Sequence, residues 1–320
     1  MTTVEVRHPI VGLALGSGSA RGWAHIGVIQ ALVEMGIAPQ VVAGTSIGAL
    51  VGAVFVSGHL EAFAEWVKTL TVRDVVGLMD FTLSGGMVKG NKLFGYIREQ
   101  YPDVDIDALP VRYASVATDM ATGREHWIRH GSVMAAARAS CALPGVFTPV
   151  EHGGRWMLDG GLVNPVPVST CRALGADVVI AVNLNGELIG RHLSDASRAE
   201  VGRESRDLAA EGTDAADDAD GEKVSAGKTA VWWRRVFERL SRAADDGRAP
   251  GLFDVIATSV NIMQDRITRS RMAGEPPDIT LVPRLKDFAL MDFHRAAEAI
   301  EEGRRLVVQQ ADEIRYCVGL

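Results

Sequence analysis

Short runs of apolar residues alternate along the chain with longer stretches in which apolar positions recur every three or four residues. Short runs rich in Val, Ile and Ala are typical of buried strands, and the longer pattern is typical of helices. Strand then helix, repeated, predicts an α/β fold of three layers, with a mostly parallel central sheet and helices on both faces. The expected strands are 10–15, 40–44, 112–118, 177–184 and 278–283, with further strands at 124–130 and 155–161, and the clearest expected helices are 24–35 and 47–56.

This pattern is interrupted after residue 185. Residues 186–227 are polar, rich in Ala, Asp, Glu, Ser and Gly, and nearly free of aromatic residues. Such a composition buries too little apolar surface to offset the entropy of ordering, so we expect a disordered acidic insertion. Because strand-like sequence resumes near 278, the insertion interrupts one domain and does not separate two. We therefore expect a single domain over 1–320, with its core at about 10–185 and 250–316.

A second pattern follows the acidic segment, at residues 228–244. On a helical wheel, aromatic and aliphatic residues share one side and arginines occupy the other. This arrangement is typical of a helix at a membrane interface. A helix that packs its apolar face on the body of the protein fits equally well, so both alternatives stay open. On the first alternative, deletion of 228–244 weakens binding to anionic vesicles and leaves hydrolysis of a soluble ester largely intact. The residues expected at the interface are Trp232, Trp233, Phe237, Arg235 and Arg239.

Composition and charge narrow the class of partner and the location. The formal net charge of −7 argues against general nucleic-acid binding, which requires clustered positive charge. The three cysteines are far apart and lack metal-ligand spacing, which predicts reduced thiols and no metal site. No oxygen-rich calcium loop is present, and no cofactor is expected. The first residues lack a signal-peptide pattern, and no segment reaches roughly 18 apolar residues. We therefore expect a cytoplasmic protein, with any membrane contact peripheral and at the inner face. The sequence does not indicate the oligomeric state.

A glycine-rich loop follows the first expected strand. Gly16, Gly18 and Gly22 lie between that strand and the first expected helix. A dinucleotide-binding loop would need its third glycine one position earlier, where Arg21 stands, and an acidic residue after the next strand. A phosphate-binding Walker loop would need Gly-Lys-Ser/Thr, which is absent. The use that remains is an oxyanion hole, in which N–H groups hold the charge that develops on a carbonyl oxygen.

A serine in the next strand-to-helix turn is the candidate nucleophile. Ser46 lies between Gly44 and Gly48 in a G-x-S-x-G motif, with an expected strand before it and an expected helix after it. This context is that of a nucleophile elbow. A serine hydroxyl needs a base. The late histidines are His192, in the polar insertion, and His294, at the start of a C-terminal helical stretch, and neither lies in a glycine-framed turn.

An aspartate does lie in such a turn. Asp159 ends an expected strand and is followed by Gly160 and Gly161. The commoner role of an Asp-Gly pair is a β-turn. Its occurrence in one chain with a donor loop and an exposed serine makes Asp159 the candidate base.

The motifs "GSGSARG", "GTSIG" and "DGG", in this order, resemble those of the patatin-like phospholipases, specifically the short bacterial members related to the catalytic domain of neuropathy target esterase. Residues 85–93, 116–125 and 136–150 agree with that family as well. The resemblance covers about 10–185 and resumes near 250–310. It implies a patatin-like acyl-hydrolase whose substrates are phospholipids or lysophospholipids.

The resemblance also implies roles for individual residues. Ser46 would attack an ester carbonyl and Asp159 would act as its base, with water releasing the acyl group. The loop amides around Gly18, Ser19, Ala20 and Arg21 would stabilise the oxyanion, and Gly16 and Gly22 would shape the turn. Family loops often carry glycine where Ser17 and Ser19 stand here, a change that keeps the backbone donors. A second hypothesis, from a different functional class, is a catalytically silent protein of the same fold that binds lipid as a regulator or scaffold.

Overall fold

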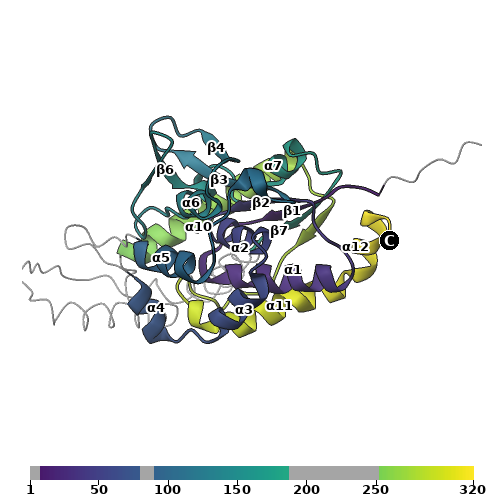
Figure 1. The fold of residues 1–320 in the computed structure, drawn as a ribbon, viewed down its shortest axis with the longest axis horizontal. Helices are drawn as coiled ribbons and strands as arrows, with labels where there is room; N and C mark the ends of the chain where they lie inside the picture. The colour runs from purple at the N-terminus through teal and green to yellow at the C-terminus, as the bar shows by residue number, and fades with distance from the viewer. Residues whose placement is uncertain (1–7, 80–89, 187–251) are drawn as a thin grey trace, which may run out of the picture.

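The protein is described here by a computed structural model, which covers residues 8–79, 90–186 and 252–320 (Figure 1). The predicted acyl-hydrolase core lies mostly within these ranges. The predicted acidic insertion beyond Gly186 lies outside the described residues. So does the predicted helix 228–244, with the proposed interfacial residues Trp232, Trp233, Phe237, Arg235 and Arg239.

One sheet forms the centre of the molecule, and most of its neighbouring strands run parallel. In spatial order the parallel strands are β8 (Ile279–Leu281), β7 (Val178–Val182), β1 (Val11–Leu15), β2 (Val41–Thr45) and β3 (Arg112–Asp119). Antiparallel strands extend the sheet at β3: β4 (Glu125–Ile128) and β6 (Arg155–Asp159) pair with β3, and β5 (Val150–His152) pairs with β6. Each strand expected from the apolar pattern is present. The pattern did not reveal β5, which is only three residues long.

Helices cover both faces of this sheet, which confirms the predicted three layers. Successive strand residues pack into different apolar clusters: Leu13 and Leu15 of β1 face one cluster, and Ala14 faces the other. Figure 1 shows α1, α3 and α11 below the strands and α7 above them. The helices are α1 (Ala24–Glu34), α2 (Ile47–Val56), α3 (Leu60–Lys68), α4 (Val72–Leu78), α5 (Asn91–Gln100), α6 (Val133–Ser140), α7 (Val168–Ala173), α10 (Leu252–Gly274), α11 (Ala296–Gln309) and α12 (Ala311–Val318).

Within the described ranges, no helix combines the length and the apolar character needed to cross a bilayer. The three cysteines, Cys141, Cys171 and Cys317, are free thiols.

Glycines bring α11 into close contact with α1, the helix that follows the glycine loop. A Cβ atom on Gly27 of α1 would lie 1.8 Å from the carbonyl oxygen of Ile300, and a Cβ atom on Gly303 of α11 would lie 2.0 Å from that of Ala24. Any larger side chain at either position would push the two backbones apart. Helix α11 thereby holds α1, and with it the loop, in place.

The pairing of β3 determines which strand ends meet. β2 and β4 both pair with Ser115 and Val116, so they lie on opposite sides of β3. β4 and β6 both pair with Ala117 and Thr118, so these two also lie on opposite sides. β2 and β6 therefore follow one another along the same side of β3. Because they run in opposite directions, the last residues of both strands meet at the middle of that side.

Candidate active site

Ser46 lies in the sharp turn between β2 and α2. Its backbone angles are φ 57° and ψ −125°, a conformation that is strained for any residue other than glycine. The flanking glycines make room for this turn: a Cβ atom on Gly44 would lie 2.5 Å from the carbonyl oxygen of Gly48, and one on Gly48 would lie 2.2 Å from that of Leu15. The turn has the geometry of a nucleophile elbow, and it presents the serine hydroxyl at the carboxyl edge of the sheet.

Asp159, at the end of β6, receives that hydroxyl. Ser46 Oγ donates a hydrogen bond of 2.6 Å to Asp159 Oδ2 across 113 positions of sequence. The other carboxylate oxygen, Oδ1, accepts the N–H of Gly161 at 2.7 Å. No residue larger than glycine fits at position 160, because a Cβ atom on Gly160 would lie 2.0 Å from the carbonyl oxygen of Val116. Both carboxylate oxygens are thus fixed in place, one of them on the serine.

The environment of Asp159 suits a base. Its side chain is fully buried, and this burial raises its pKa from 3.8 to about 6, against the opposing effect of the hydrogen bonds from Ser46 and Gly161. At neutral pH the group is still mainly ionised. Its proton affinity is far higher than that of a solvated carboxylate, and general bases work best when their pKa lies near the operating pH.

Ser140, at the end of α6, is a site residue that sequence reasoning missed. Its Oγ accepts the backbone N–H of Ser46 at 2.8 Å and donates to the carbonyl oxygen of Val116. Ser140 lies in the segment 136–150, where the family resemblance was noted, but no local pattern distinguished it from any other helix serine. These two hydrogen bonds of Ser140 hold the strained backbone of the elbow in place.

The glycine loop contributes free N–H groups beside Ser46. Of the four loop amides expected as donors, two are already engaged: Ala20 N–H donates to Leu290 O at 3.2 Å and Arg21 N–H donates to Gly18 O at 3.3 Å. Among the described residues, no acceptor lies within hydrogen-bond distance of the N–H groups of Gly18 and Ser19. Of the four expected donors, the N–H groups of Gly18 and Ser19 therefore remain available to an oxyanion. Ser19 has a positive φ of 52°, which turns this part of the loop.

The other loop glycines lie where the loop touches its neighbours. A Cβ atom on Gly16 would lie 2.6 Å from the carbonyl oxygen of Val182, and one on Gly22 would lie 2.2 Å from Cγ1 of Ile47, the residue after the serine. The close contacts at both glycines agree with their expected role in shaping the turn.

His25 supports the loop from α1. Burial lowers its pKa to about 4, so the ring is neutral and its Nε2 donates to Gly16 O at 2.8 Å.

Arg21 adds a buried positive charge. Its guanidinium donates through Nε to Gly18 O at 3.1 Å and through Nη2 to Asn261 Oδ1 at 3.3 Å. Burial lowers its pKa to about 10, so the group remains a cation at neutral pH. No carboxylate among the described residues forms an ion pair with it. The loop therefore combines free amide donors with a positive charge that no carboxylate of the described residues pairs, an environment that stabilises a developing anion.

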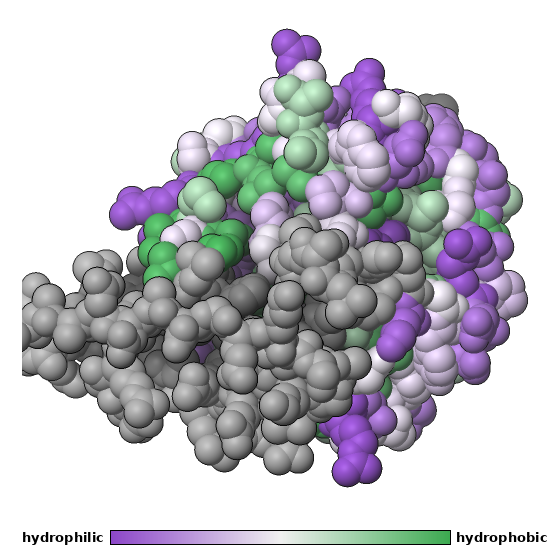
Figure 2. Space-filling model, turned by 90° about the vertical axis from the view of Figure 1, so that its left-hand side faces the viewer, coloured by the Kyte–Doolittle hydropathy of each residue, from purple (hydrophilic) through white to green (hydrophobic). Residues whose placement is uncertain are grey.

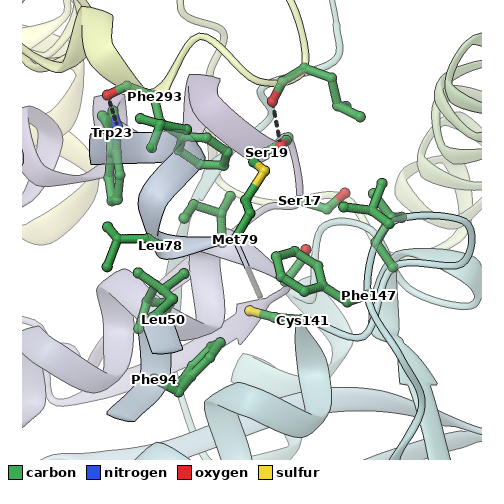
Figure 3. A pocket seen from close by; sticks show the side chains of 18 of the residues that line it. Ser17, Ser19, Trp23, Leu50, Leu78, Met79, Phe94, Cys141, Phe147 and Phe293 are labelled. Atoms are coloured by element: carbon green, nitrogen blue, oxygen red, sulfur yellow. Dashed lines mark hydrogen bonds between the residues drawn. The ribbon is translucent and has the colours of Figure 1, made fainter. Parts of the chain in front are cut away.

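An apolar pocket opens over Ser46 (Figure 3). Aliphatic and aromatic side chains from α2, α4, α5, the 140s loop and the C-terminal segment line it. They include Trp23, Leu50, Leu78, Met79, Phe94, Phe147 and Phe293, which point into the same space in Figure 3. Polar groups gather at the catalytic end, where Ser17, Ser19, Asn261 and Gln264 accompany Ser46. On the side of the molecule that carries α4, α5 and the start of α10, apolar side chains also gather at the surface (Figure 2). This distribution suits an aliphatic chain with a polar group at one end.

The helix that completes the pocket, α10, was not identified from the sequence. It begins after the interruption of the α/β pattern and contributes Val260, Asn261 and Gln264 to the lining. Asp265 and Thr268 on the same helix are also buried. The polar residues on its buried face hide the periodicity that would otherwise mark a core helix.

The family model described as patatin-like phospholipase matches residues 13–172, which is half of the chain and includes Ser46 and Asp159. The chain belongs to the patatin-like phospholipase family. An uncharacterized NTE family protein of Mycobacterium tuberculosis is 37% identical over 330 residues, covering 94% of this chain and 91% of that protein. The neuropathy target esterase sws of Drosophila melanogaster is 34% identical over 185 residues, which are 55% of this chain and 13% of the fly protein.

Among solved structures, VipD from Legionella pneumophila is similar to the chain with a TM-score of 0.43 and 13% identity, covering 95% of this chain and 67% of VipD. The patatin-like phospholipase family that was expected from the three motifs is thus confirmed through its sequence relatives.

Proposed function

We propose that this patatin-like protein is a serine acyl-hydrolase that cleaves lipid acyl esters, of the phospholipase A or lysophospholipase type. The observation that carries the proposal is the 2.6 Å hydrogen bond from Ser46 Oγ to a buried carboxylate, at the floor of an apolar pocket. A binding protein has no need of a strained serine with a raised-pKa base. The alternative of a silent lipid-binding scaffold is therefore the less favoured one.

In the proposed reaction, the acyl chain lies among the apolar side chains and the ester carbonyl carbon faces Ser46. Asp159 takes the hydroxyl proton as Oγ forms its bond to that carbon. The carbonyl oxygen gains negative charge and accepts hydrogen bonds from the N–H groups of Gly18 and Ser19, near the positive charge of Arg21. When the ester C–O bond breaks, the proton held by Asp159 passes to the departing oxygen. Water then enters, gives a proton to Asp159 and forms a bond to the acyl carbon; the bond from that carbon to Ser46 Oγ breaks, the proton returns from Asp159 to Oγ, and the fatty acid is released.

The proposal extends to location. We place the enzyme in the cytoplasm, in peripheral contact with the inner face of the membrane, where lipid substrates are found. Exposed apolar side chains on α10 support such a contact, because Val255, Ile262 and Met263 are each more than 40% exposed on the helix that also lines the pocket. The substrate is a phospholipid or a lysophospholipid.

A fluorophosphonate probe tests the nucleophile. The wild-type protein should be labelled, and Ser46→Ala and Asp159→Asn should each abolish labelling while circular dichroism shows a retained fold. Ser57→Ala is the matched control, because Ser57 lies at the other end of α2 and outside the pocket. Equal labelling of the wild type and Ser46→Ala would contradict the proposal.

Release of fatty acid from a panel of lysophospholipids and diacyl phospholipids then identifies the substrate. A labelled enzyme that hydrolyses none of these lipids would be a serine hydrolase of another substrate class. A protein that binds the lipids but is neither labelled nor active would be the scaffold.

A further inference from the structure

Gln264 of α10 lies at the catalytic end of the pocket with only 4% of its surface exposed. Its side-chain oxygen accepts two hydrogen bonds, from Ser17 Oγ at 2.9 Å and from Asn185 Nδ2 at 3.0 Å. These two donors hold the carboxamide from the oxygen side, so its NH₂ group points the other way. Within the described ranges, this nitrogen has no hydrogen-bond acceptor.

The free NH₂ group lies on the side of the proposed base. A Cβ atom on Gly161 would lie 2.3 Å from Gln264 Nε2 and 2.9 Å from Asp159 Oδ1, so both atoms lie against the same backbone carbon. This position also explains the orientation of the carboxamide, because a carboxylate attracts the amide hydrogens and repels the amide oxygen. Because Gln264 lines the pocket, an oxygen atom of the bound ligand would supply the acceptor that this N–H group lacks.

Acyl transfer at Ser46 involves several oxygen atoms, and their positions differ. The carbonyl oxygen belongs at the free amides of the glycine loop. The oxygen of the departing alcohol must come within reach of Asp159, because that residue returns the proton to it. Gln264 Nε2 lies on this second side of the site.

We propose that Gln264 donates a hydrogen bond to the leaving-group oxygen of the ester, and to the water that takes its place in the second step. This inference rests on the proposed hydrolase function and defines a subsite for the alcohol part of the substrate. The bond from Ser46 Oγ to the acyl carbon forms and the ester C–O bond breaks. The proton moves from Ser46 to Asp159 and then to the alcohol. Gln264 keeps both of its protons and stabilises the oxygen only while that oxygen gains negative charge.

The chemistry of the leaving group gives this role a distinctive signature. The alcohol of a glycerolipid is a poor leaving group, so its oxygen carries much charge when the C–O bond breaks. A p-nitrophenolate spreads its charge over the ring and needs little assistance. Loss of the Gln264 donor should therefore slow an alkyl ester far more than a p-nitrophenyl ester with the same acyl chain. A general loss of structure would slow both alike.

The experiment compares kcat/KM for a p-nitrophenyl ester and a glycerol ester of one fatty acid. Two variants are used: Gln264→Met and Gln264→Leu each remove the whole amide and place no second carboxylate beside Asp159. Each should lower kcat/KM for the glycerol ester by about ten- to a hundredfold, which is the usual cost of a lost hydrogen bond to a charged group. The p-nitrophenyl ester should change by less than about threefold.

The matched control is Thr268→Val, one turn further along α10. Thr268 is buried and donates to the backbone oxygen of Gln264, but it does not line the pocket. Its substitution should leave the ratio of the two kcat/KM values unchanged. Equal losses on both esters in the variants of Gln264 would overturn the inference. A wild-type protein that is not labelled by fluorophosphonate and hydrolyses neither ester would instead contradict the proposed function itself.

Discussion

The backbone N–H of Ser46 donates a 2.8 Å hydrogen bond to Oγ of Ser140, which in turn donates to the carbonyl oxygen of Val116 in β3. The strained turn that carries the proposed nucleophile is therefore tied to the sheet through a side chain on α6. Strained backbone persists only where surrounding contacts hold it, and Ser140 supplies one such contact directly at the serine.

Substitution of Ser140 should therefore reduce activity as well as stability. Ser140→Ala leaves a buried N–H and a buried carbonyl oxygen without partners, which should cost about 1–3 kcal/mol of unfolding free energy. We also expect kcat to fall by about tenfold, since small displacements of a reacting group cost rate, with KM for a soluble ester little changed. Urea unfolding and the rate of fluorophosphonate labelling measure the two effects.

Ser132→Ala separates positioning from general destabilisation of α6. Ser132 caps the same helix by accepting the N–H of Ala135 at 2.9 Å, far from the elbow. Loss of this cap should cost about 1 kcal/mol of stability without slowing labelling. If the two variants slow labelling equally, Ser140 has no positioning role.

The raised pKa of Asp159 predicts the pH dependence of the reaction. The base must be ionised to accept the serine proton, and burial raises its pKa to about 6. kcat/KM for a soluble ester should therefore be constant at neutral pH and fall tenfold per unit below about pH 6. The solvated value of 3.8 would keep activity intact to pH 5. A pH profile measured over the stable range of the fold, checked by intrinsic fluorescence, discriminates between these values.

The same burial implies that Asp159→Asn stabilises the fold. The folded-state pKa lies above the unfolded value of 3.8, so the folded protein binds this proton more tightly. The stability contributed by this group is complete below about pH 4 and is lost as pH rises through about 6, leaving a cost on the order of 2–3 kcal/mol at neutral pH. A neutral amide avoids that cost and still contacts Ser46 and Gly161.

Asp159→Asn should therefore raise the urea midpoint at pH 7.5 and have little effect near pH 4, while activity is lost at every pH. Unfolding curves at the two pH values provide the measurement. A variant that is less stable than the wild type at pH 7.5 would show that the carboxylate, despite its burial, stabilises the folded state.

The local parts of this site could be predicted from the residues themselves, and the long-range pairing of Ser46 with Asp159 only from the family resemblance. Ser46 and Asp159 stand out because glycines mark tight turns after apolar runs. That they meet depends on β2 and β6 sharing one side of β3, and β6 enters antiparallel, which no local pattern encodes. The hydrogen bond from Ala20 N–H to Leu290 O, a partner 270 positions away, could not be predicted from the sequence for a similar reason.

Buried polar residues were the harder case. No local pattern distinguished Ser140 or Gln264 as a site residue, because a polar residue is usually exposed. Their partners are distant in sequence: Ser17 is 247 positions from Gln264. Because the α/β pattern is interrupted before α10, the helix that carries Gln264 could not be recognised from the sequence either. Most of the strands and helices follow from periodicity, but the polar network that shapes the site follows only from the tertiary contacts.

The close contact between α2 and the glycine loop gives a final prediction, for Gly48→Ala. Alanine is the better helix former by about 1 kcal/mol, yet its Cβ atom would lie 2.2 Å from the carbonyl oxygen of Leu15 and 2.7 Å from that of Gly16. Both are backbone atoms, so α2 or the loop must move, and Ser46 moves relative to the donors of Gly18 and Ser19. We expect labelling to fall by about a hundredfold or more and the urea midpoint to drop.

Gly95→Ala is the control for Gly48→Ala, because no neighbouring atom lies within 4 Å of its Cβ position in α5. That variant should gain about 0.5–1 kcal/mol and keep full labelling. Full labelling of Gly48→Ala would instead mean that the elbow tolerates a shift of the loop, and that the amide donors are not aligned as the site requires.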